Sequence, residues 1–278
     1  MQALLENEIL NNPAVEAGIV PFLLAIIVGA VLPKRFAWWS TLVFAIGYFI
    51  SAWLILDGRL TPLSSSRKLV IPGAGAVFLG FILPKLFTYS KALQQILIIV
   101  AIAATLWLIW PKLSRADLWD QVTLAIGSGA YALWLSFAFF QLRDEDIATS
   151  VSATVLGFAT GVCALVGASS LLGELGIAVG ASSAAIALYG FGKRIDHSAG
   201  FYFPIAILCA LVGIASVIYA KVPWYTLIAL GFIPLLAMLF EWRYKSGILR
   251  IIKLSLFILI PAALAVYVTW QAAGPIPL

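Results

Sequence analysis

The sequence predicts an all-α protein, a polytopic bundle of about ten transmembrane helices that includes a tandem two-helix repeat. Composition is the first observation: 63% of the residues are hydrophobic, 10% are charged and the mean hydropathy is +1.07. A soluble domain is nearer to one-half apolar and one-quarter charged. The second observation is a series of apolar runs that approach the roughly twenty residues needed to cross a hydrocarbon core of about 30 Å. The third is a segment that occurs twice.

The repeated segment occupies two stretches of equal length, VPFLLAIIVGAVLPK at 20–34 and IPGAGAVFLGFILPK at 71–85. At a constant offset of 51 residues, the matched positions include Pro21 with Pro72 and Gly29 with Gly80. A second apolar stretch follows each copy, so the repeated units are 18–56 and 70–110. Membrane proteins are commonly built from such repeats. Because an even number of helices separates the copies, we expect them to cross the membrane in the same direction.

The chain divides into three parts. Residues 1–17 form a short acidic tail that contains no Lys or Arg, so it does not resemble a cleaved secretory signal, which begins with basic residues. Residues 18–110 hold the tandem repeat. Residues 111–278 hold six further helices, including a glycine-rich hairpin at 148–191.

In chain order the predicted helices cover 18–33, 36–56, 70–84, 92–110, 120–141, 148–168, 171–191, 201–220, 223–242 and 251–270. The first and third are short and end in Pro-Lys, where we expect the proline to stop the helix and the lysine to reach the headgroups. The second and fourth close the two repeat units with Trp-Leu-Ile. The other six have apolar residues on every face, which only a helix can satisfy in lipid, whereas barrel strands would alternate.

The hairpin at 148–191 carries small residues at helical spacing on both of its helices. They are Ala153, Gly157 and Gly161 on the first helix, and Gly176, Gly180 and Ala184 on the second. In lipid, helices associate where small residues let their backbones approach, and almost no loop separates these two. We therefore expect a close antiparallel pair, in which Ser170, Ser182 and Ser183 supply hydroxyls at or near the contact. A cavity along the stripe is the less common alternative.

Orientation follows from the Lys and Arg residues. With the N-terminus outside, eleven of the seventeen lie in inner loops and six in outer ones. The bias towards the inner side places both termini outside, as expected for a multi-pass protein of a bacterial inner membrane. The basic residues occur singly or in pairs, so the net charge of +5 does not indicate a nucleic-acid partner. The expected partners are the lipid bilayer and, in one interpretation below, other membrane subunits.

Glu174 is the strongest candidate for a functional polar residue. An ionisable side chain inside a membrane indicates function by default, and a carboxylate among small residues could coordinate a cation or carry a proton. The alternative is that a helix begins near Ser170, which would put Glu174 in its first turn and let the helix dipole stabilise the charge by about 0.3–1 kcal/mol. Asp120, at the start of another predicted helix, has the same alternative.

The sequence indicates no enzyme, no cofactor and no metal. It contains no glycine-rich phosphate loop, no paired aspartate motif and no Ser/His/Asp set. His197 is the only histidine, and Cys163 and Cys209 each lie within an apolar run, so zinc or haem would lack its usual ligands. We expect both cysteines to be small core residues.

Two functions remain. The first is a small transporter or permeation protein of unknown substrate, indicated by the repeat, the prolines within helices and the glycine-rich hairpin. The second is a non-catalytic structural or accessory subunit, or an assembly factor, of a larger membrane complex. It is indicated by the scarcity of charge within the apolar runs.

Overall fold

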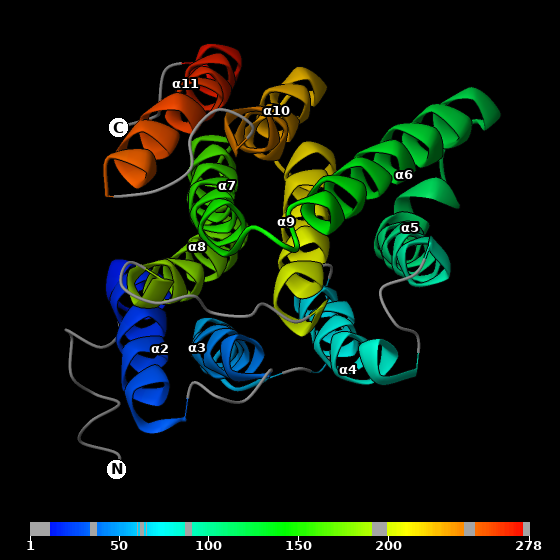
Figure 1. Ribbon diagram of the computed structural model, residues 1–278. Helices are drawn as coiled ribbons and strands as arrows, with labels where there is room; N and C mark the ends of the chain where they lie inside the picture. The colour runs from blue at the N-terminus through cyan, green and yellow to red at the C-terminus, as the bar shows by residue number, and fades with distance from the viewer. Residues whose placement is uncertain are drawn as a thin grey trace.

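The computed structural model describes residues 12–33, 38–59, 61, 64, 66–86, 91–190, 199–241 and 248–274. This part of the chain contains ten α-helices and no strand (Figure 1). A π-helical turn, η1 (Val15–Ile19), leads into the first α-helix and a 3₁₀ turn, η2 (Arg67–Leu69), into the third. The helices are α2 (Val20–Val31), α3 (Trp39–Ile55), α4 (Val70–Leu86), α5 (Lys91–Leu113), α6 (Leu118–Gln141), α7 (Asp146–Val166), α8 (Ser170–Gly190), α9 (Ala199–Tyr219), α10 (Trp224–Glu241) and α11 (Ile248–Ala273). The all-α prediction is confirmed, and each helix coincides with a predicted one to within a few residues.

The structure indicates a membrane protein. Six helices, α5, α6, α7, α8, α9 and α11, are long and apolar enough to cross a bilayer. Three shorter apolar helices cover Val15–Val31, Trp39–Ile55 and Trp224–Phe240. Large apolar side chains stand on the outside, among them Ile126, Leu256 and Ile260. An apolar exterior of this extent suits lipid and not water.

Helix α9 is the centre of the fold. It crosses the middle of the ribbon view in yellow (Figure 1) and packs mainly against α4, α6 and α7, with further contacts to α5, α8 and α3. Its apolar stretch is 89% buried inside the protein, against 33% for α5 and α11. Small residues bring neighbours close: an added Cβ on Gly200 would lie 2.6 Å from Thr41 of α3. One on Gly73 of α4 would lie 2.8 Å from Leu208 of α9.

The two segments that the sequence predicts to be repeat copies pack differently. Helix α2 packs against α3, whereas α4 packs chiefly against α9 and α5 chiefly against α6. The helix of the first copy ends at Val31, and Leu32 before Pro33 is extended, as expected for a residue that precedes proline. The expectation that the second copy also ends at its Pro-Lys pair is wrong, because α4 continues through Pro84 to Leu86.

Trp39 contacts the end of α2. Its indole Nε1 donates hydrogen bonds to the carbonyl oxygens of Gly29, at 3.3 Å, and Leu32, at 3.2 Å. These bonds satisfy acceptors that the end of α2 leaves open. At the offset of the repeat the residue equivalent to Trp39 is Ser90. The second segment therefore has no indole at the matched position, and α4 extends to Leu86.

Helices α7 and α8 form the closest pair in the described structure. An added Cβ on Gly157 would lie 2.4 Å from the backbone nitrogen of Gly180, and one on Gly176 would lie 2.6 Å from the Cα of Gly161. These distances are too short for a side chain, so the two backbones touch directly. The link between the helices is short, with Ala168 at a φ of +68°.

Candidate functional site

Hydroxyl groups are buried on α9 and on helices that pack against it. Some of them donate to a carbonyl oxygen one turn earlier in their own helix, as Thr105 does to Ala101 and Ser216 to Val212. Others have no hydrogen-bond partner among the described residues: Ser40, Tyr48, Ser51, Ser128, Tyr131, Ser136, Ser152, Thr160 and Ser182. Leaving a buried hydroxyl unpaired costs about 1–3 kcal/mol, so these groups are candidates to contact water or a polar solute.

Ser182 lies where α2, α3 and α8 meet. Its Oγ would be 2.9 Å from a Cβ added to Gly47 of α3, and the carbonyl oxygen of Pro21 would be equally close at 2.9 Å. Ser182 itself is completely buried. Its neighbour Ser183 is satisfied locally, since its hydroxyl donates to the carbonyl oxygen of Val179 at 2.8 Å. Of the two serines, only Ser182 presents a free hydroxyl to a three-helix junction.

A second set of polar groups passes through the centre of the protein beside α9. Cys209, near the middle of α9, lies near Tyr48 of α3 and Tyr131 of α6. Tyr131 also lies near Cys163 of α7, which in turn lies beside Thr269 of α11. Both cysteines are buried free thiols, as the sequence predicted for small core residues. The interior of this apolar protein is therefore not purely hydrocarbon.

Three carboxylates gather at one end of the bundle. Glu16 of η1 interacts through its charge with Glu174 of α8 and with Asp57, which follows α3. Glu174 is half-buried, and no salt bridge joins it to any described residue. These side chains are far apart in the sequence and lie together because η1 packs against both α8 and α3.

The expected position of Glu174 within its helix is wrong. Helix α8 does begin at Ser170, but Glu174 is its fifth residue, and the first turn contains no acidic side chain. The favourable effect of the helix dipole falls off within the first turn, so the dipole contributes little to stabilising a charge on Glu174. Ser170, the first residue of the helix, is exposed.

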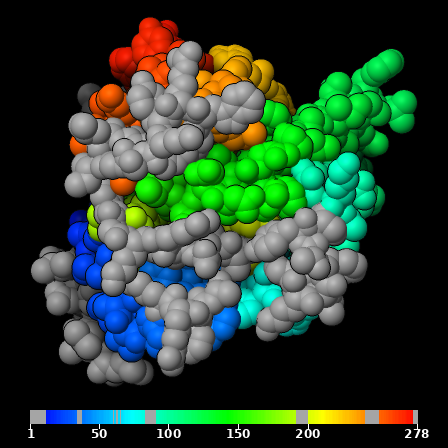
Figure 2. All heavy atoms as spheres, viewed as in Figure 1, coloured from blue at the N-terminus to red at the C-terminus, as the bar shows by residue number. Residues whose placement is uncertain are grey.

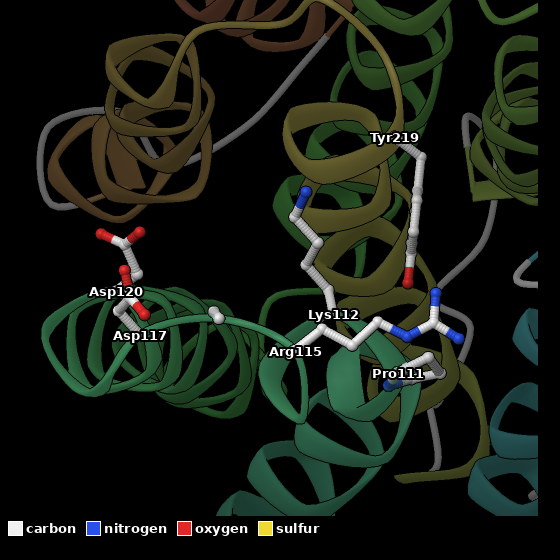
Figure 3. Close-up of a pocket in the computed structure, with 7 residues that line it drawn as sticks. Pro111, Lys112, Arg115, Asp117, Asp120 and Tyr219 are labelled. Carbon is white, nitrogen blue, oxygen red and sulfur yellow. The ribbon is translucent and has the colours of Figure 1, made fainter.

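Asp120 lies in a different part of the protein from Glu174. It is exposed in the first turn of α6, where the dipole does favour it. It lines a cavity of about 440 Å³ together with Lys112, Arg115, Asp117 and Tyr219 (Figure 3). The structure therefore does not bring Asp120 and Glu174 into one site.

Sequence reasoning missed Glu16 because it assigned residues 1–17 to a tail. Helical structure begins at Pro13, and the side-chain oxygen of Asn12 accepts a hydrogen bond from the backbone N–H of Ala14 at 3.0 Å. An Asn-Pro pair at a helix start was the available signal. Within the described ranges, no group of three His, Cys, Asp or Glu side chains could hold a metal ion. His197 lies outside the described residues.

Comparison of the chain with protein-family models finds no match, and comparison with curated proteins finds none either. Its function is therefore argued from the arrangement of its own residues.

Proposed function

We propose that this protein is a small membrane transporter or permeation protein, and that its substrate passes along the inner faces of the helices around α9. The observation that carries the proposal is the set of buried hydroxyls without partners, including Tyr48, Ser128 and Ser182. A protein that only needed to pack in lipid would place apolar residues at these positions, because unpaired polar groups destabilise it. Hydroxyls that meet water or a polar solute are no longer unpaired.

The carboxylates at one end suit the mouth of such a path. Glu16, Asp57 and Glu174 concentrate negative charge at one end of α2, α3 and α8. Acidic groups at a pore mouth attract cations and repel anions. We infer that the substrate is a small cation or a proton, and that Glu174 is the group in the mouth that binds it.

The finer assignments belong to the same proposal. We place the protein in a bacterial inner membrane with both termini outside, on the excess of Lys and Arg in the loops that would then be inner. That orientation puts Glu174 and Glu16 at the outer mouth. We also propose that 18–56 and 70–110 are tandem copies whose packing has since diverged, on the matched residues of the two segments.

The proposal predicts that water reaches the unpaired hydroxyls. In a background that carries Cys163→Ala and Cys209→Ala, we expect Ser182→Cys and Ser128→Cys to react with a small hydrophilic methanethiosulfonate in membranes. Two matched cysteines should stay unreactive: Ile126→Cys, whose parent side chain faces outwards, and Ala178→Cys, whose parent is buried among apolar groups. Such reagents modify the thiolate, which forms in water and not in lipid. Folded Ser182→Cys and Ser128→Cys proteins that both fail to react would contradict the proposal.

One observation favours the accessory-subunit function instead. Leu118 and Trp119, at the start of α6, are 74% and 79% exposed, and this end of α6 projects from the molecule in the space-filling view (Figure 2). A partner subunit could cover it. Purification in mild detergent separates the two functions, because an accessory subunit would leave the membrane with a partner in fixed stoichiometry.

A further inference from the structure

A charged cavity and an apolar groove lie along the same side of α6. The charged cavity, of about 440 Å³, lies between the end of α5, the start of α6 and the end of α9. Figure 3 shows Asp117 and Asp120 on one side of it and Lys112 and Arg115 on the other, with the Arg115 guanidinium directed towards Tyr219. None of these four groups forms a salt bridge with a described residue. Two cations and two carboxylates thus line one cavity, and no salt bridge joins them.

The apolar groove has a volume of about 630 Å³ and lies between α6 and α10. Glycines keep it open: an added Cβ on Gly127 would come within 3.6 Å of the Trp224 ring, and one on Gly231 within 3.1 Å of the Trp134 indole. The indole Nε1 of Trp134 donates to the carbonyl oxygen of Gly231 at 2.9 Å. Because that bond satisfies the indole, what remains to line the groove is almost entirely hydrocarbon.

Helical spacing connects the cavity to the groove. Asp120, Gly127, Tyr131 and Trp134 follow one another at intervals of seven, four and three residues, which places them on one face of α6. Seven residues of helix span about 10 Å. In Figure 1, α6 runs outwards from beside α9, so its charged end lies away from the centre of the molecule. A ligand on this face would meet both charges first and then hydrocarbon.

We propose that the cavity and the groove together bind one phospholipid with a zwitterionic phosphoethanolamine headgroup. Lys112 and Arg115 hold the phosphate, because both side chains form charge-assisted hydrogen bonds with phosphate oxygens. Asp117 and Asp120 hold the primary ammonium, which has three N–H donors. One acyl chain lies between α6 and α10. An anionic headgroup without an amine would give the two carboxylates no positive partner. Charge complementarity therefore favours a zwitterionic headgroup.

The test measures retained lipid by native mass spectrometry on delipidated full-length protein in detergent. Phosphatidylethanolamine, phosphatidylcholine and phosphatidylglycerol with identical acyl chains are added separately. We expect the first to be retained at least about tenfold better than phosphatidylglycerol. Lys112→Gln with Arg115→Gln should remove that binding. Asp117→Asn with Asp120→Asn should reverse the preference towards phosphatidylglycerol, since only the cations remain. Lys91→Gln, an exposed cation at the start of α5, is the control and should change nothing.

The groove is tested separately. Gly127→Leu should fill it and weaken all three lipids alike, without altering the headgroup order. Free phosphoethanolamine, which has no acyl chain, should not displace the bound lipid. Equal retention of the three lipids by the folded parent protein would overturn the proposal. It would also be overturned if the variant with both Asp117→Asn and Asp120→Asn retained the three lipids in the same order as the parent protein. A dimer that Gly127→Leu dissociates while lipid retention stays constant would show that a second copy of the chain occupies the groove, and would also overturn it.

Discussion

The role assigned to Glu174 changes once its neighbours in the structure are known. In the sequence it resembles an ordinary carboxylate near a helix start, which the dipole alone would justify. In the structure it lies past the first turn of α8, half-buried, and faces the negative charge of Glu16. Repulsion between two carboxylates disfavours the arrangement unless a proton or cation relieves it. This is the physical basis for assigning it to the mouth of the path.

The residue-scale prediction is that Glu174→Gln removes cation flux. The assay uses proteoliposomes with an imposed membrane potential and follows the uptake of protons or monovalent cations with an internal dye. We expect this uptake to fall at least about tenfold, because the variant loses the charged group that binds the permeant ion. Asp144→Asn is the control, because Asp144 is exposed and already paired with Arg143 at 3.3 Å. Equal flux in Glu174→Gln and parent protein would show that Glu174 has only a structural role.

At the scale of elements, the α7–α8 hairpin and the repeat illustrate two different outcomes. The hairpin brings Gly157, Gly161, Gly176 and Gly180 to one contact, and local information was enough to indicate it, because the two helices are adjacent in the chain and carry matched stripes. The predicted repeat rests on an equally plain sequence match, yet α4 packs mainly against α9 and hardly against α3 or α5. Similar segments pack differently when the rest of the bundle offers them different partners.

The element-scale prediction concerns this hairpin. Gly161→Leu or Gly180→Leu should overpack the contact and lower the unfolding free energy by about 1–3 kcal/mol or more, because the added side chains would meet backbone atoms of the partner helix, within 2.6 Å at Gly161 and 2.7 Å at Gly180. Thermal unfolding in detergent measures the change. Gly190→Leu, in the same helix as Gly180 but with nothing within 4 Å of its added Cβ, should be nearly neutral. Unchanged unfolding of both contact variants would show that these glycines do not hold the pair together.

At the scale of the whole molecule, α9 organises the bundle. It is buried almost along its length, while α5 and α11 keep most of their surface outside. The unpaired hydroxyls of α3, α6, α7 and α8 belong to helices that all contact α9. A path along this central helix would be shielded from lipid on every side, which is a requirement for moving a polar solute through hydrocarbon.

Topology supplies the whole-molecule prediction. In a background without native cysteines, Gln2→Cys and Ile276→Cys should both react with a membrane-impermeant thiol reagent added outside intact cells. The reason is that the ten crossings we propose would return the chain to its starting side. Asp144→Cys, in the link between α6 and α7, should be protected until the cells are opened. Protection of both terminal cysteines together with labelling at position 144 would reverse the orientation and place the acidic mouth inside.

The sequence by itself determined the class, the number and approximate bounds of the helices, and the close approach of α7 and α8. Each depends on local quantities: the length of an apolar run, a proline, a stripe of small residues. Only the tertiary structure decided that α9 is central, that Glu16 lies near Glu174, that Asp120 faces Lys112 and Arg115 across a cavity, and which serines remain unpaired. The reason is that helices made for lipid are apolar on every face, so hydrophobicity does not mark the inward side as it does in a soluble protein. Small residues and polar groups determine which helices pack together, and this packing depends on helices that are distant in the chain.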